Sequence, residues 1–155
     1  MTSPGSDPRT RIFPPAISIV SVLVGVGLHY LWPLRLVPQP EGRWIGGALI
    51  AAWLALAAWA VGVFRRAGTT PNPTGEVTAF VTAGPFRFSR NPMYVGLVLF
   101  QVGVAFLLGN AWVLILTIPS FILLDRLVIA GEERYLAAKY GADFEAYRRR
   151  VRRWL

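Results

Sequence analysis

Four strongly apolar runs divide the chain, and each is long enough, or nearly so, to cross a bilayer as a helix. They cover residues 14–32, 44–64, 93–108 and 111–130. At a rise of 1.5 Å per residue the first run spans roughly 28 Å, about the thickness of the hydrocarbon layer, whereas the third spans only roughly 24 Å. Pro119 predicts a kink in the fourth run. The pattern predicts an all-α integral membrane protein with four transmembrane helices.

The polar segments complete this organisation. Residues 1–13 form a short N-terminal tail, and residues 131–155 form a helical tail with two short amphipathic helices broken at Gly141. Between them, residues 14–130 make up the membrane domain. The first apolar run is longer than the ~7–15 residues of a signal-peptide core and is followed by no small-residue cleavage site, which favours a retained anchor.

Composition indicates a membrane protein, and the distribution of charge indicates its orientation. The hydrophobic content of 54% and the mean hydropathy of +0.48 are too high for an ordinary soluble domain. The net charge of +8 is divided unequally between the two sides of a four-span arrangement. Only two basic residues fall on one side (Arg35 and Arg43), and 13 fall on the other (Arg9, Arg11, Arg65, Arg66, Arg87, Arg90, Arg134, Lys139, Arg148, Arg149, Arg150, Arg152 and Arg153). We therefore expect both termini in the cytoplasm.

The same distribution limits the partners and the chemistry. The basic residues at positions 148–153, followed by Trp154, are expected to bind anionic lipid headgroups. Nucleic-acid binding has little support, because the sequence has no basic stripe on a soluble domain. The absence of cysteine excludes disulfides, thiolate metal sites and thiol nucleophiles, and a single histidine gives a metal centre no support.

A helical hairpin should bring two polar stretches together. The third and fourth apolar runs are joined at Gly109-Asn110, a dipeptide suited to a tight turn. Since a hairpin returns its ends to the same side, the turn at Arg90-Asn91 should face Glu132 and Glu133 at one edge of the membrane. Polar groups that converge where lipid meets water are the arrangement of a site.

Four blocks of sequence carry a family resemblance. They are residues 69–73, 84–96, 132–133 and 140–147, and in this order they resemble the isoprenylcysteine carboxyl methyltransferase and phospholipid methyltransferase superfamily over about residues 69–155. The resemblance implies an S-adenosylmethionine-dependent methyltransferase with its cofactor pocket at the cytoplasmic face and an acceptor that enters from lipid. It implicates Arg90, Asn91, Pro92, Tyr94, Glu132 and Glu133, with Arg126 as a weaker choice. Relatives often have His at position 91 and Pro at position 131, so Asn91 retains a hydrogen-bond donor but cannot act as a base.

The chemistry of the donor gives these residues roles. Asn91 as N-cap and Pro92 at the first helical position would leave backbone N–H groups for the carboxylate of S-adenosylmethionine. Glu132 or Glu133 could accept from its ammonium or ribose hydroxyls, and the ring of Tyr94 could face its sulfonium. The candidate catalytic residues are Arg90, Glu132 and Glu133, and the candidate cofactor-binding residues are Asn91, Pro92, Tyr94, Gly96, Glu132 and Glu133.

Several alternatives stay open. The acceptor is lipidic or amphipathic, either a carboxylate, which needs little acid–base catalysis, or an amine, which would need a glutamate base. Arg90 or Arg126 could hold an acidic acceptor, but Arg126 beside Asp125 could equally be a structural ion pair. Gly96 and Gly103 could admit adenine or permit close helix packing. An NAD(P)H-dependent reductase related to membrane sterol reductases and a non-catalytic four-span protein are the competing functions.

Overall fold

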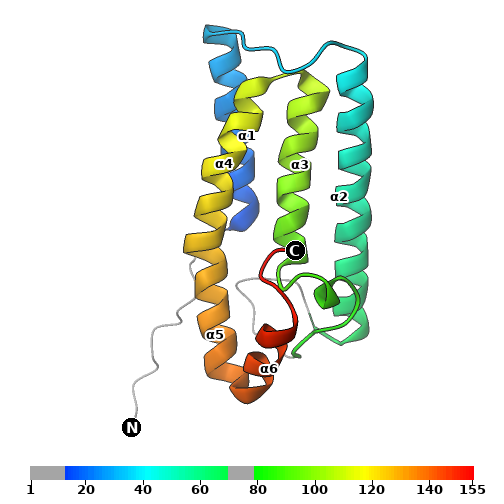
Figure 1. The fold of residues 1–155 in the computed structure, drawn as a ribbon, viewed down its shortest axis with the longest axis vertical. Helices are drawn as coiled ribbons and strands as arrows, with labels where there is room; N and C mark the ends of the chain where they lie inside the picture. Colours follow the sequence, from blue (N-terminus) through cyan, green and yellow to red (C-terminus); the bar gives the residue numbers. More distant parts are fainter. Residues whose placement is uncertain (1–12, 70–78) are drawn as a thin grey trace.

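The computed structural model describes residues 13–69 and 79–155, and within these ranges the chain is helical apart from loops and one isolated β-bridge between Arg35 and Asn110. Figure 1 shows the long helices side by side, with the C-terminal elements gathered at one end. The elements follow in the order α1 (Pro14–Leu31), α2 (Glu41–Arg66), η1 (Gly84–Arg87), α3 (Pro92–Leu108), α4 (Ala111–Leu123), η2 (Leu124–Ile129), α5 (Ala130–Tyr140) and α6 (Ala142–Arg150). Most of the expected N-terminal tail, with Arg9 and Arg11, and residues 70–73 of the first resemblance block lie outside the described residues.

Three helices of the described ranges are long and apolar enough to cross a membrane. They are α1, α2 and the continuous helical stretch Ala111–Tyr140, and α3 is a shorter apolar helix of 17 residues. The predicted all-helical architecture is thus confirmed for the described residues, and the count of four transmembrane helices stays a prediction. Helix α2 is longer than its apolar run, because Glu41 favours the positive end of the helix dipole and Arg65 and Arg66 favour the negative end.

The helical stretch that begins at Ala111 continues past residue 130, where the membrane domain was expected to end. The helix that begins at Ala111 does not stop there but passes through a π-helical segment, η2, into α5. No proline follows Pro119 in this stretch, and the polar residues after Ala130 are good helix formers, so nothing in the local sequence ends the helix. A single rod therefore joins the apolar interior of the bundle to its polar end (Figure 1).

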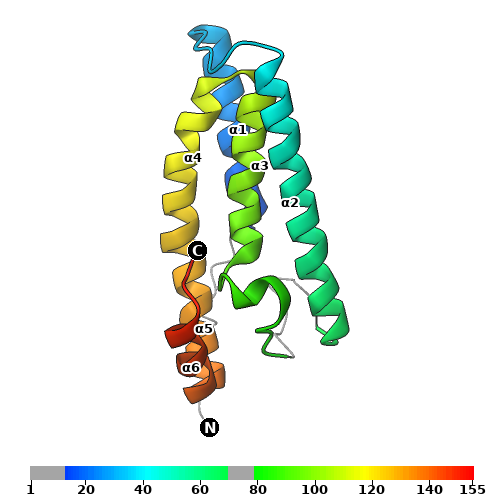
Figure 2. The same cartoon turned by 45° about the vertical axis from the view of Figure 1, so that its right-hand side comes forward.

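Glycines allow the long helices to approach closely. Gly46 of α2 lies against the backbone of α3, where an added Cβ would come within 2.6 Å of the Leu107 amide nitrogen and 2.7 Å of the Gly103 carbonyl oxygen. On the other side of the bundle, Gly25 of α1 similarly contacts Val113 of α4. Figure 2 shows α3 between α2 and α4 in this packing.

The C-terminal residues fold back toward the start of α3. Gly141, at φ +49°, ends α5 and reverses the chain into α6, as predicted. The Tyr147 hydroxyl of α6 then donates to the Phe86 carbonyl oxygen of η1 at 2.6 Å. After α6, residues 151–155 run back beside the junction of α4 and α5, as Figure 2 shows.

Candidate active site

A cavity of about 440 Å³ opens at the polar end of the bundle. Its wall combines aromatic and aliphatic side chains with a small polar group of residues at one side. The lining comes from the start of α1 (Phe13, Pro14 and Pro15), from α2 (Trp53, Ala57 and Phe64), from the segment around η1 (Ala79, Phe80, Val81 and Phe86), from the turn into α3 (Arg90, Asn91, Pro92, Met93, Tyr94, Gly96 and Leu97) and from α5 and α6 (Glu132, Glu133, Tyr135, Leu136, Phe144 and Tyr147).

The first polar pair on this wall joins α3 to α5. The buried Tyr94 lies one turn inside α3, and its hydroxyl donates to the Glu132 Oε1 atom at 2.6 Å. Glu132 is half-buried and lines the cavity. The pair places a carboxylate and an aromatic ring together at the cavity surface.

The second polar pair lies beside it and is more fully buried. Arg90 donates from Nε at 3.0 Å and from Nη2 at 2.8 Å to the Glu133 Oε1 atom. Its remaining Nη1 group donates to the carbonyl oxygens of Val151 at 2.6 Å and Arg148 at 3.2 Å. Only 10% of the Arg90 side chain and 11% of the Glu133 side chain are exposed. All three guanidinium nitrogens therefore donate within the protein.

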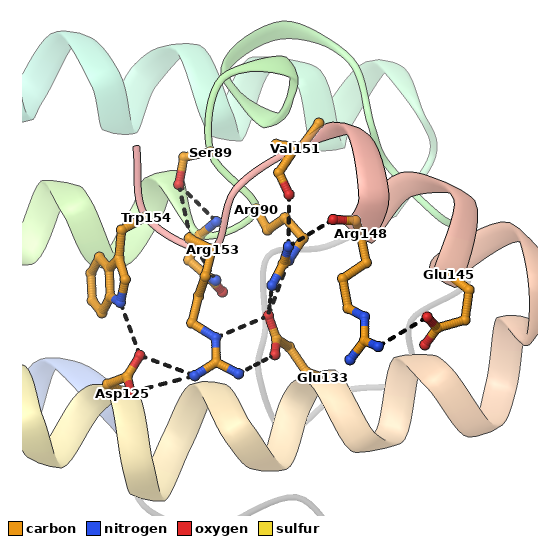
Figure 3. A network of polar contacts seen from close by, with 10 residues as sticks. Ser89, Arg90, Asp125, Glu133, Glu145, Arg148, Val151, Arg153 and Trp154 are labelled. Atoms are coloured by element: carbon orange, nitrogen blue, oxygen red, sulfur yellow. Dashed lines mark hydrogen bonds and ion pairs between the residues drawn. The ribbon is translucent and has the colours of Figure 1, made fainter.

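A second arginine approaches Glu133 from the other side. Figure 3 shows Glu133 between the guanidinium groups of Arg90 and Arg153. Arg153 Nη2 lies 2.5 Å from Glu133 Oε2, and Arg153 Nη1 lies 3.3 Å from Asp125 Oδ1. The Trp154 indole also donates to Asp125 Oδ1 at 2.9 Å. Hydrogen bonding to the Glu133 carboxylate is the main cause that raises the pKa of Arg153.

The two acids of the predicted pair thus have different surroundings. Both face the turn at Arg90-Asn91, as the hairpin argument predicted. Glu133 is held by two guanidinium groups, and Glu132, the less buried of the two, accepts from the Tyr94 hydroxyl at the cavity wall. Glu132 is the acid that is better placed to meet a bound molecule.

Comparison with known proteins assigns the chain to a family. Residues 42–143, two thirds of the chain, match the family described as phospholipid methyltransferase. The chain belongs to this family. The resemblance to the isoprenylcysteine carboxyl and phospholipid methyltransferase superfamily is confirmed, and with it a membrane methyltransferase at family level.

A protein of similar sequence was also found. An uncharacterised protein from Haemophilus influenzae is 35% identical over 63 residues, which are 41% of this chain and 100% of that protein. No solved structure matches the chain. The geometry described above therefore carries the assignment of individual residues.

Asn91 and Pro92 begin α3 as expected, with Asn91 at the N-cap position and proline in the first turn. Asn91 occupies the N-cap position of α3, but its side chain makes no capping bond. Instead its Nδ2 group donates to the Arg153 carbonyl oxygen at 2.9 Å. The amides of Tyr94 and Val95 both donate to the Asn91 carbonyl oxygen. The Val95 bond is the usual first bond of the helix, whereas the Tyr94 bond engages an amide of the first turn.

The other expected site residues fall into two groups. Pro92 and Gly96 line the cavity, and a Cβ on Gly96 would come within 3.1 Å of the Trp53 ring, so this glycine also permits close packing of α3 on α2. Arg126 is not part of the cavity wall: 80% of its side chain is exposed, and it lies 3.7 Å from Asp125 Oδ2.

Aromatic residues of the cavity wall were missed by the sequence analysis. Phe80 stacks on Tyr140 with ring centroids 4.9 Å apart and meets Tyr147 edge-on at 5.4 Å. Burial raises the pKa of Tyr147 to about 12, so its hydroxyl stays protonated and keeps its bond to Phe86. Tyr147 lies in a block of the resemblance and could have been proposed from it, whereas nothing in the local sequence marks Phe80.

Proposed function

We propose that this protein is an S-adenosylmethionine-dependent methyltransferase that acts on a lipidic or amphipathic acceptor at the cytoplasmic face of its membrane. The proposal depends on one observation above all. An otherwise apolar cavity holds the Tyr94–Glu132 pair on its wall, beside the buried Arg90–Glu133 pair. Family membership supplies the reaction class, and the cavity supplies a place for it.

The wall residues fit the chemical groups of this donor. S-adenosylmethionine supplies a methyl group on a sulfonium cation, together with an ammonium, a ribose diol and a flat adenine. The Glu132 carboxylate can accept from the ammonium or the ribose hydroxyls, and the face of the Tyr94 ring attracts a cation by roughly 0.5–2 kcal/mol. The aromatic rings of Phe80, Phe144 and Tyr147 offer apolar surface for the adenine. The volume of about 440 Å³ is within the usual range for small-molecule sites.

The apolar side of the cavity is the proposed place of the acceptor. Phe13, Pro14 and Pro15 at the start of α1 line the cavity together with Trp53 and Ala57 of α2, and both helices are long and apolar enough to cross a membrane. An alkyl chain held there would place its polar end near Tyr94 and Glu132. Positioning of donor and acceptor would supply most of the catalysis. If the acceptor is an amine or a hydroxyl group, Glu132 is the available base.

Arg90 is a poor anchor for an acidic acceptor. Each of its three guanidinium nitrogens already donates within the protein, to Glu133 or to a backbone carbonyl. Four of the five guanidinium N–H groups are used in this way. A bound carboxylate would be left with the second Nη2 N–H, or would have to displace a partly buried bond at a cost of about 1–3 kcal/mol. We therefore assign Arg90 and Glu133 to the support of the site and Glu132 with Tyr94 to contact with the ligand. Arg126 lies outside the cavity wall and is exposed, so its proposed role is to contact headgroups at the membrane surface.

Orientation in the membrane follows from charge. Arg65, Arg66 and the exposed basic residues of α6 lie at the end of the bundle that holds the cavity, and Arg35 and Arg43 lie at the other end (Figure 1). The excess of positive charge at the cavity end supports placing that end in the cytoplasm. The basic residues of α6 would bind anionic headgroups there at about 1 kcal/mol each.

Calorimetric titration of the purified protein with S-adenosylhomocysteine tests the proposal. We expect saturable binding with one site per chain and weaker binding by Glu132→Gln. Glu145→Gln is the matched control, because Glu145 forms an exposed pair with Arg148 away from the cavity wall. Absence of binding by a folded sample, or saturable binding of NADPH in its place, would overturn the proposal. If S-adenosylhomocysteine binds, lipid mass spectrometry after feeding a labelled methyl donor would identify the acceptor.

A further inference from the structure

The residues that follow α6 form part of the support of the cavity. We call residues 151–155 the C-terminal strap. Its backbone follows the turn into α3: the Arg90 amide donates to the Arg152 carbonyl oxygen at 2.9 Å, and the Ser89 hydroxyl and the Asn91 side chain both donate to the Arg153 carbonyl oxygen. The strap is thereby joined to the three residues that immediately precede α3.

The side chains of the strap bind the opposite wall. Arg153 bridges Glu133 and Asp125, and Trp154 donates to Asp125 (Figure 3). Arg153 thus holds the turn through its carbonyl oxygen and the helical rod through its guanidinium. Glu145 and Arg148 form an ordinary exposed pair nearby, with 40% and 53% of their side chains exposed. The Glu133 and Asp125 side chains are only 11% and 17% exposed, so their contacts are far less screened by water.

The location of Asp125 explains how one arginine reaches two acids. Successive residues of an α-helix are rotated by roughly 100°, so residues eight apart differ by roughly 80° and residues seven apart by roughly 20°. A π-helical turn accommodates one extra residue. Asp125 lies within η2, and the wider turn lets Asp125 and Glu133 face the same side although they are eight residues apart.

We propose that Arg153 is a positioning residue of the cofactor site, which acts through Glu133. By holding the Glu133 carboxylate against Arg90, it fixes the turn at Arg90-Asn91 and the neighbouring Glu132 in the places that the bound cofactor needs. This inference rests on the proposed function, since it assigns a role in the same cavity. Arg153 touches no ligand in this scheme.

Two measurements on Arg153→Ala test the inference, with Arg150→Ala as the matched control. Arg150 is the exposed last residue of α6, so its loss changes the net charge equally. The first measurement is hydrogen exchange in peptides that cover residues 88–96. We expect faster exchange of the Arg90 and Asn91 amides in Arg153→Ala only. The second is affinity for S-adenosylhomocysteine well below the unfolding temperature, where we expect a loss of roughly 10–100-fold, the range typical for groups that support a ligand-binding residue.

Two further variants separate positioning from general stability. Arg153→Lys keeps the charge but not the two-pronged geometry, and we expect it to restore part of the affinity. In a Glu133→Gln background, Arg153→Ala should cost little more, because the group through which it acts is already lost. If Arg153→Ala matches Arg150→Ala in exchange and in affinity, the inference is wrong. If the wild type binds no S-adenosylhomocysteine, the proposed function is wrong, and the exchange result still decides whether Arg153 positions the turn.

Discussion

Replacing Glu133 with glutamine should destabilise the protein far more than the same change at the surface. The Glu133 carboxylate accepts from Arg90 and from Arg153, and the substitution leaves both cations facing a neutral amide. Loss of one partner from a buried ion pair costs about 3–5 kcal/mol. Arg153 is 36% exposed and retains Asp125, so we take the lower end, about 3 kcal/mol. For a chain of this length the unfolding midpoint should fall by roughly 6–12 °C.

The assay is thermal unfolding in detergent followed by tryptophan fluorescence, since the chain has six tryptophans. Glu145→Gln is the control, because its pair with Arg148 is largely exposed and worth about 0–1 kcal/mol. We expect its midpoint to stay within roughly 4 °C of the wild type. Equal midpoints for the two variants would show that Glu133 is not held in the way described, and the reasoning about the site's support would be refuted.

Three further predictions address the packing, the cavity and the tail. Gly46→Ala should destabilise the fold by about 1–3 kcal/mol in thermal unfolding because its Cβ would meet the backbone of α3, whereas Gly47→Ala, which has nothing within 4 Å, should not. Tyr94→Phe should weaken binding of S-adenosylmethionine about tenfold in calorimetry, since it removes the bond to Glu132 but keeps the ring. Because the pKa of Tyr147 is raised to about 12, the folded form keeps this proton at pH values where the unfolded chain loses it. The temperature of the unfolding midpoint should therefore decrease as the pH rises from 10 to about 12, and it should decrease less in Tyr147→Phe.

The helices were predictable because a bilayer imposes a simple pattern. The third apolar run was expected at residues 93–108, and α3 spans Pro92–Leu108, ending where Gly109 adopts φ +59°. The hairpin argument also brought the two acids to the turn before α3, because it needed only the number of spans and the position of the polar residues. Both inferences use information that lies along the sequence itself.

The partners within the site were less accessible to such reasoning. Asp125 was considered with its neighbour Arg126, and these two side chains do lie 3.7 Å apart, but Asp125 also pairs with Arg153, 28 residues away. Asn91 is the N-cap residue of α3 as expected, but the bond from its side-chain amide to the Arg153 carbonyl oxygen was not foreseen. In both cases the additional partner is one that only the folded C-terminal strap provides.

The helical rod from Ala111 to Tyr140 carries both Asp125 and Glu133, the two acids that bind Arg153. In uninterrupted α-helical geometry, Asp125 would be turned roughly 80° away from Glu133, and one guanidinium could not serve both as it does here. The π-helical segment removes most of that difference, so the buried acids together offer two negative charges to Arg90 and Arg153. Two charges of each sign then balance within the cluster, which lowers the cost of burying them at the edge of the membrane. Glu132, on the adjacent position of the rod, is thereby left facing the cavity, where a cationic cofactor would meet it.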